Sequence, residues 1–152
     1  MRSHSADIHR FMKEGPLCAC GNLRKAVRAV THFYDEALRP VGLRATQVAL
    51  LGACGMLEGV TMSRLAEFLV MDRTTLTRNL RPLEREGLIR IKAGKDQRER
   101  DVTITRQGVG SLAKVYPLWK KAQSRVATGL GQERMSRLLS DLSTLVEVTR
   151  VK

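Results

Sequence analysis

Apolar residues recur every three or four positions over long segments of this chain, which is the period of an amphipathic α-helix. The first such stripe covers residues 23–38 and ends before Pro40 and Gly42, two residue types that stop helices. Residues 46–54 are nearly all apolar, so they predict a buried second helix closed by Gly55.

The C-terminal third of the chain shows the same period in two further stripes. Thr105 can cap a long helix, and Pro117 should bend or interrupt that helix. A final helix is predicted at about residues 132–148. The fold is therefore expected to be mainly α.

Residues 61–87 predict two short helices with only a few residues between them. Thr61 can cap the first and Asp72 the second, because a side-chain oxygen at this position accepts a hydrogen bond from a free N–H of the first turn. Gly87 suits the left-handed position that follows a helix. The expected buried faces are Leu65, Phe68 and Leu69 in the first helix, and Leu76, Leu80 and Leu83 in the second.

Two segments that alternate apolar and polar residues, 88–92 and 102–105, flank the polar segment 93–100. This alternation is the period of a half-buried strand, so the three segments predict a β-hairpin with a charged tip.

The charge of the chain narrows the class of its partner. Lys and Arg number 27 against 15 Asp and Glu, which gives a formal net charge of +12 and makes a polyanion the natural partner. Only 4% of the residues are aromatic, too few for the stacking surfaces of proteins that bind single strands. Duplex DNA fits better.

Other classes of protein lack their sequence signals. No apolar run reaches the roughly 18 residues that a membrane span needs. The polar N-terminus lacks the features of a secretory signal and the three cysteines do not suggest a disulfide scaffold, so we expect a cytoplasmic protein. Without a phosphate-binding loop, a nucleophile elbow or a His-Glu-x-x-His motif, we expect no enzyme, no cofactor and no metal site.

Four motifs in order carry a resemblance to a known family: Ser63-Arg-Leu-Ala-Glu, Met71-Asp-Arg-Thr-Thr-Leu-Thr-Arg, Leu83-Glu-Arg-Glu-Gly-Leu-Ile and Asp96-Gln-Arg-Glu-Arg-Asp-Val-Thr-Ile-Thr-Arg-Gln-Gly. Over residues 17–148 the chain resembles the multiple-antibiotic-resistance regulator (MarR) family. The resemblance implies a winged helix-turn-helix with a small β-hairpin wing and with N- and C-terminal dimerisation helices. The expected division is a mobile N-terminal arm at 1–16 and one domain at 17–152, with dimerisation helices at 17–42 and 106–150 and the DNA-binding lobe at 46–105.

The helix that starts at Asp72 is the candidate for the major groove of DNA. Arginine can bond guanine through two hydrogen bonds, and threonine can contact base edges or the thymine methyl group. The alternative is an ordinary solvated face. The candidate side chains are Arg73, Thr74, Thr75, Thr77 and Arg78.

The wing is the second candidate DNA contact. The resemblance implies that Arg98 at the hairpin tip enters the minor groove and that Asp96 braces it, with Arg100 nearby. The alternative is a charged loop that only aids solubility. Candidate contacts to the DNA backbone are Ser63, Arg90 and Lys95.

The expected function is therefore sequence-specific regulation of transcription by binding duplex DNA. The resemblance implies a homodimer, and a two-fold axis would pair it with a pseudo-palindromic operator. We expect a repressor that is released by a small molecule or by thiol oxidation. The alternative is an architectural protein that binds nucleic acid without sequence preference, as the charge would also allow.

Candidate sensing residues lie outside the DNA-binding lobe. Cys18 and Cys20 are at the start of the first helix, where the helix dipole and Arg24 favour a reactive thiolate. By resemblance to the organic-hydroperoxide repressors of the family, Cys20 falls near the reactive cysteine and Tyr34 matches one supporting tyrosine, whereas Arg24 replaces the other. The alternative is that the cysteines only pack as small apolar groups, as we expect for Cys54.

A conventional ligand pocket between the dimerisation helices and the DNA-binding lobe is the other candidate for sensing, and a basic lining would favour a carboxylate. Its candidate residues are Thr31, His32, Tyr116 and Trp119, besides Tyr34.

Overall fold

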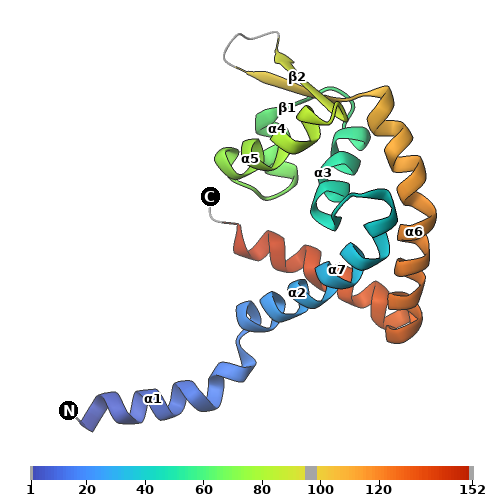
Figure 1. Cartoon of the computed structure of the whole chain (residues 1–152). Coiled ribbons are helices and arrows are strands. Elements are labelled where there is room, and N and C mark those ends of the chain that lie inside the picture. The colour runs from blue at the N-terminus through green and yellow to red at the C-terminus, as the bar shows by residue number, and fades with distance from the viewer. Residues whose placement is uncertain (1, 95–98, 151–152) are drawn as a thin grey trace.

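The computed structural model describes residues 2–94 and 99–150, which form mostly helices with one small sheet (Figure 1). This confirms the predicted mainly α fold with a β-hairpin. In chain order the elements are α1 (Arg2–Glu14), the 3-10 helix η1 (Gly15–Leu17), α2 (Ala19–Leu38), the 3-10 helix η2 (Arg39–Val41), α3 (Ala45–Met56), β1 (Val60–Thr61), α4 (Met62–Phe68), α5 (Arg73–Arg85), β2 (Ile89–Ala93), β3 (Arg100–Ile104), α6 (Arg106–Leu130) and α7 (Gln132–Thr149).

The hydrophobic core lies mainly in one lobe, formed by α3, α4, α5 and the sheet (Figure 1). Its fully buried side chains include Leu51 of α3, Leu65 of α4 and Val102 of β3. The long helices α2, α6 and α7 lie on the other side of the molecule and contribute less to this core. In α7 no residue is buried, although its sequence carries a regular apolar stripe.

The sheet has the antiparallel order β1-β3-β2. Ile91 of β2 pairs with Val102 of β3, and Val60 of β1 pairs with the same Val102 from the other side. The hairpin was predicted, whereas β1 was not. Its two residues are too few to show an alternating pattern, and they form a strand only because β3 lies beside them.

Three predicted helix caps are present as hydrogen bonds. Thr61 Oγ1 accepts from the N–H of Arg64 at 3.3 Å, and Thr105 Oγ1 accepts from the N–H of Gly108 at 3.1 Å. Asp72 caps α5 through its carboxylate. Gly87 follows α5 with a φ of 69°, the left-handed conformation that glycine adopts without strain. These local signals place α4, α5 and α6 correctly.

Residues 2–14, which lie in the expected mobile arm, form the helix α1, and the mobility of this arm stays a prediction. Two predictions about other segments were wrong. Gly55 does not close α3, which continues to Met56. Phe68 is 47% exposed, because the buried face of α4 is formed instead by Met62, Leu65 and Ala66 at helical spacing. Pro117, predicted to bend or interrupt α6, does not interrupt it, because α6 continues from Arg106 to Leu130 with Val115 and Ala122 buried on either side of the proline.

Candidate nucleic-acid interface

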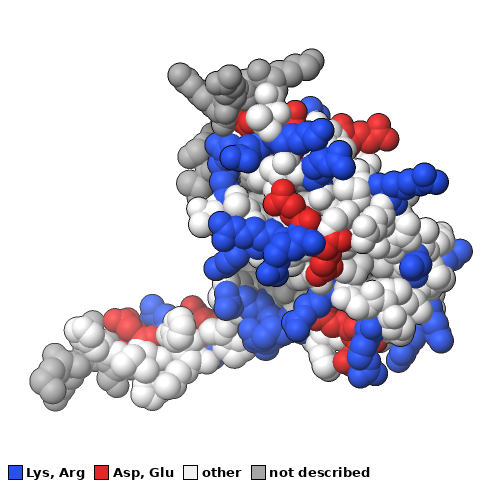
Figure 2. Space-filling view, turned by 45° about the horizontal axis from the view of Figure 1, so that its top comes forward, with Lys and Arg blue, Asp and Glu red and all other residues white. Residues whose placement is uncertain are grey.

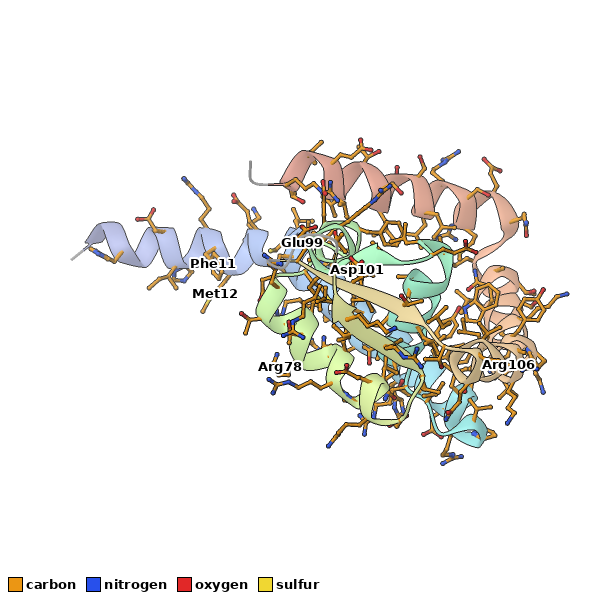
Figure 3. All side chains as sticks on the ribbon, turned by 90° about the horizontal axis from the view of Figure 1, so that it is seen from above. Phe11, Met12, Arg78, Glu99, Asp101 and Arg106 are labelled. Carbon is orange, nitrogen blue, oxygen red and sulfur yellow. The ribbon has the colours of Figure 1, made fainter. Side chains whose placement is uncertain are left out.

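The orientation of α5 is fixed by its buried leucines. Leu76, Leu80 and Leu83 are all 0% exposed and lie on one face of the helix, so the opposite face must point to solvent. Arg78 projects from α5 at the edge of the molecule (Figure 3). A shallow hollow of about 380 Å³ on this exposed face is lined by Arg73, Thr74, Thr77, Arg78 and Arg81.

The start of α5 is held by its N-cap. Asp72 Oδ1 accepts a hydrogen bond from the N–H of Thr75 at 2.8 Å. Hydrogen bonds from the side chain and then the backbone of Thr75 lower the pKa of the exposed Asp72 carboxyl below its usual range. The cap therefore fixes the first turn of α5, from which Arg73 and Thr74 extend.

The three predicted threonines have different environments. Thr74 is exposed, whereas Thr75 and Thr77 are half-buried. The Thr77 hydroxyl donates to the carbonyl oxygen of Arg73 at 2.7 Å, so it can only accept from an outside group. The structure brings the five predicted residues together in the first two turns of one helix.

Arg81 belongs to the same face and was missed by the sequence reasoning. It follows Arg78 by three residues and Arg73 by eight, a spacing that would have placed it on this face. With Arg73 of α5 and Arg100 of β3, it lines a hollow of about 430 Å³ between α5 and the wing, which also includes the carboxylate of Glu84. The wing and α5 thus form one continuous basic surface.

The basic residues of β2 lie on the other face of the wing. Arg90 and Lys92 alternate with the half-buried Ile91, so both lie on the outer face of β2, away from the hollow beside α5. With Arg106 they line a second basic hollow of about 340 Å³. Figure 3 shows Arg106 at the start of α6. The predicted contacts Lys95, Asp96 and Arg98 lie outside the described residues.

Ser63, predicted as a contact to the DNA backbone, also contacts the wing. Its hydroxyl donates to Glu99 Oε1 at 3.3 Å, which joins the start of α4 to the residue before β3. Glu99 and Asp101 are neighbouring carboxylates on this arm of the hairpin (Figure 3). The sequence reasoning did not identify Glu99, because only the fold brings it to Ser63.

Figure 2 shows Lys and Arg side chains gathered over the face that carries the wing and α5, with fewer Asp and Glu among them. Among the described residues, ion pairs join Glu36 to Arg39 and Glu133 to Arg137. The arginines of α5 form no ion pair within the described chain, although Glu84 lines the same hollow as Arg73 and Arg81. They are free to approach phosphates.

The cysteines differ in environment. Cys18 is the N-cap residue of α2 and Cys20 lies in its first turn, and both are exposed. Cys20 lines an apolar groove between α2 and α7. Cys54 is buried, as predicted, and burial raises the pKa of its thiol to about 11. Only the cysteines at the start of α2 are accessible to a solution oxidant.

Tyr34 lies away from Cys20 within the same chain. Fourteen residues separate them along α2, which is about 21 Å of helix. The Tyr34 hydroxyl donates instead to the Gln123 side-chain oxygen of α6, and burial raises the pKa of that hydroxyl. Tyr34 therefore joins α2 to α6, and one chain does not combine the two predicted sensor residues.

The predicted ligand-pocket residues are divided between α2 and α6. Thr31 is half-buried and His32 exposed on α2, while the rings of Tyr116 and Trp119 stack on α6 with centroids 6.3 Å apart. A hollow of about 320 Å³ between α2 and α6 has a different lining, which includes Phe33 and Arg125. The role of the predicted pocket residues stays a prediction.

None of the helices within residues 2–94 and 99–150 is long and apolar enough to cross a membrane. Among the same residues, no group of three or more His, Cys, Asp or Glu side chains is placed to hold a metal ion.

Comparisons with known proteins agree with this geometry. A model of the MarR family matches residues 41–99. The M. tuberculosis transcriptional regulator MosR, solved in complex with DNA, is 39% identical, with a TM-score of 0.78 over 88% of this chain and 99% of that one. The transcriptional repressor CouR, bound to a 23-mer DNA duplex, is 25% identical, with a TM-score of 0.78 over 89% of this chain and 96% of CouR.

YwoH, an HTH-type transcriptional regulator of Bacillus subtilis, is 26% identical over 85 residues. That match spans 56% of this chain and 62% of YwoH, less than two thirds of the relative. The family model covers both short helices, and the likeness to MosR covers nearly the whole of that regulator. The chain therefore belongs to the MarR family of DNA-binding transcriptional regulators, which are not enzymes.

Proposed function

We propose that this regulator is a homodimeric repressor that reads a pseudo-palindromic operator and is released by thiol oxidation or by a small molecule. The observation that carries the DNA-binding half is the exposed face of α5, where Arg73, Arg78 and Arg81 lie beside Arg100 of the wing. Arginines on a helix that enters the major groove can read guanine, and arginines of a wing can reach phosphates or the minor groove.

We assign base reading to the first two turns of α5. Arg73, Thr74 and Arg78 are exposed there, whereas the half-buried Thr75 and Thr77 can offer only methyl groups or an acceptor oxygen. Contacts to the DNA backbone are proposed for Ser63, Arg90 and Lys95, and contacts from the wing for Asp96, Arg98 and Arg100. The proposal for Lys95, Asp96 and Arg98 rests on sequence alone.

The homodimer is supported by apolar surface that one chain leaves uncovered. On α2, Val27 is 60% exposed and Val30 is 47% exposed. On α7, Leu139 is 52% exposed and Val146 is 40% exposed. Contiguous apolar faces on two neighbouring helices are typical of a subunit interface, and a two-fold axis would present both copies of α5 to one side of DNA.

Release would follow a population shift, in which the modified dimer holds its two α5 helices at a spacing that no longer fits successive major grooves. For oxidation we propose Cys20. A hydroperoxide would transfer one oxygen atom to its thiol, giving a sulfenic acid, and would leave as the alcohol. The neighbouring Cys18 lies outside the helix in an extended conformation, so helical geometry does not fix its distance from Cys20.

The alternative trigger is a small carboxylate. Lys121 and Arg125 line the hollow between α2 and α6, and the Arg125 guanidinium lies 5.1 Å from the ring centroid of Phe33. A cation beside an aromatic ring suits an aromatic acid.

Selection of binding sites from random duplexes tests the central proposal. We expect a two-fold symmetric consensus with half-sites about one helical turn apart. Arg78→Ala should weaken binding to that consensus about 10- to 100-fold, with little effect on random duplex. Arg134→Ala, an exposed arginine of α7, removes the same charge away from α5 and should change binding much less. Equal affinity of the wild type for consensus and random duplex would instead indicate an architectural protein.

Oxidation is tested on the same operator. Treatment with a hydroperoxide should reduce the affinity of the wild type and of Cys54→Ser, and thiol reductant should restore it. Cys20→Ser should bind the operator equally well before and after treatment. If the wild type also retains its affinity, release by oxidation is excluded and the small carboxylate remains the proposed trigger.

A further inference from the structure

Helix α1 presents an apolar face that has no partner among the described residues of its own chain. Ile8, Phe11 and Met12 are spaced by three and four residues, which places them on one face, and they are 53%, 75% and 69% exposed. The helix stands clear of the body in two views, with Phe11 and Met12 away from every other element (Figures 1 and 3). An amphipathic helix of this kind gains little stability until its apolar face is covered.

The connection to α2 keeps α1 pointing outward. Gly15–Leu17 forms the 3-10 helix η1, and the Asn22 side-chain amide donates to the carbonyl oxygens of Pro16 at 2.8 Å and Cys18 at 2.9 Å. These hydrogen bonds join the turn to the first turn of α2. They fix the turn against α2, and α1 extends from this turn away from the rest of the chain (Figure 1).

A matching apolar surface is open at the same edge of the molecule. A groove of about 660 Å³ between α2 and α7 is lined by Leu23, Val27 and Leu145, with Cys20 at one end. From Cys20 to Arg28 the groove extends about 12 Å along α2, whereas the apolar face of α1 from Ile8 to Met12 spans about 6 Å. The groove is therefore long enough for this face.

The flank of α1 next to Phe11 and the α2 side of the groove carry charges of opposite sign, whereas Arg10 and Lys13 lie farther round α1. Asp7 and Glu14 are two helical turns apart on the side of α1 next to Phe11. Arg24 and Arg28 are one turn apart and line the groove on α2. An antiparallel or parallel approach of α1 can therefore place carboxylates near these arginines while its apolar face enters the groove.

We infer that α1 is an exchanged arm, whose apolar face docks into the α2/α7 groove of a second copy of this chain. This rests on the homodimer proposed above. Two-fold symmetry makes the contact reciprocal, so each arm covers the groove of the other subunit and the interface contains the contact twice. Because Cys20 lines the groove, a docked arm also restricts access of reagents to that thiol.

Sedimentation equilibrium of the full chain and of two matched double variants tests the arm. Phe11→Ala with Met12→Ala truncates the apolar face, and Arg10→Ala with Lys13→Ala truncates the opposite face while keeping helix-forming alanine at both sites. We expect the apolar double variant to raise the dimer dissociation constant by at least about tenfold. We expect the control double variant to change it by less than about threefold.

The rate of Cys20 alkylation by iodoacetamide, measured in a Cys18→Ser background, gives an independent readout. It should be slow in the wild-type dimer, and several-fold faster in the Phe11 and Met12 variant at a concentration where that variant is still dimeric. Circular dichroism shows whether each variant is folded.

The possible results distinguish a failure of the arm proposal from a failure of the homodimer proposal. A wild type that is monomeric at micromolar concentration overturns the homodimer and the arm together. A dimer whose dissociation constant and Cys20 rate are unchanged in both double variants overturns the arm alone. Slow alkylation that persists on dilution to monomer shows that α1 covers its own groove, and binding of α1 to anionic vesicles with an unchanged dissociation constant shows a membrane partner. Either result also overturns the arm.

Discussion

Gly108 lies where the first turn of α6 passes closest to the wing, and alanine at this site tests how α6 is attached to the DNA-binding lobe. An added Cβ would lie 2.2 Å from the carbonyl oxygen of Leu88 and 2.8 Å from Cγ1 of Ile104, whereas real Cβ contacts essentially never fall below 3.0 Å. The Leu88 oxygen cannot simply move aside. It accepts a hydrogen bond from the N–H of Thr105 at 3.0 Å, and the Thr105 hydroxyl, whose hydrogen is shared with the carbonyl oxygen of Gly87, lies 3.2 Å away.

The size of the effect follows from two opposing terms. Within a helix, alanine is more favourable than glycine by about 1 kcal/mol. Overpacking a tightly packed site costs about 1–3 kcal/mol, and the two short contacts of Gly108, one of them with backbone, place it at the upper end. We expect Gly108→Ala to lower the free energy of unfolding by about 2 kcal/mol. Gly110 is exposed in the same helix and has nothing within 4 Å of an added Cβ. Gly110→Ala should therefore raise the free energy of unfolding by about 0.5–1 kcal/mol.

Urea unfolding measures both variants, at one protein concentration because the proposed dimer would unfold in a concentration-dependent way. Operator binding of the folded Gly108→Ala protein should also weaken, because relief of the contact separates α6 from β2. Gly110→Ala should bind like the wild type. The reasoning is refuted if Gly108→Ala is as stable as the wild type, or if both alanine variants lose stability equally.

Three further predictions concern single residues. Val70 is a β-branched residue at a φ of 53°, so Val70→Gly should raise the free energy of unfolding by about 1 kcal/mol in the same urea assay, and a loss would contradict the strain. Hydrogen bonds from Thr75 lower the pKa of Asp72 in the folded state. The Asp72 carboxylate therefore stabilises the fold at pH values above its unfolded-state pKa. This contribution is lost as the pH falls through the lower folded-state pKa. Asp72→Asn keeps an N-cap but removes the charge, so the stabilities of wild type and variant should differ at about pH 5 and converge toward about pH 2. A difference in stability that does not change with pH argues against this coupling of stability to the protonation of Asp72. Burial raises the pKa of Cys54 to about 11, so iodoacetamide at about pH 8 should label Cys18 first, Cys20 more slowly beneath the docked arm, and spare Cys54, as mass spectrometry would show.

Sequence alone predicts the DNA-binding lobe well because its signals are local. A cap such as Asp72 acts within three residues, and the Leu76, Leu80 and Leu83 stripe orients α5 without reference to any other segment. Once that stripe is known to be buried, the exposed position of Arg78 follows. Arg81 could have been predicted in the same way, since it shares the helical face of Arg78.

The errors arise where distant segments decide the outcome. Strand β1 exists only beside β3, and Phe68 is exposed because Met62, outside the predicted stripe, completes the buried face of α4. The hydrogen bond from Tyr34 to Gln123 joins residues 89 positions apart, so no local pattern indicates it. The identity of Tyr34 alone therefore suggested a sensor residue but gave no information on its distance from Cys20.

The long helices are attached to the DNA-binding lobe at two separate places. Arg150, which follows α7, donates through Nη2 to the carbonyl oxygen of Glu67 in α4 at 3.0 Å. Thr105, which precedes α6, donates through its hydroxyl to the carbonyl oxygen of Gly87 after α5 at 2.6 Å. Each short helix is thus held at its C-terminal end by a different long helix. A change in the angle between α6 and α7 would strain one of these hydrogen bonds or turn α4 relative to α5. We propose that an event in the α2/α7 groove beside Cys20 reaches the exposed face of α5 by this route.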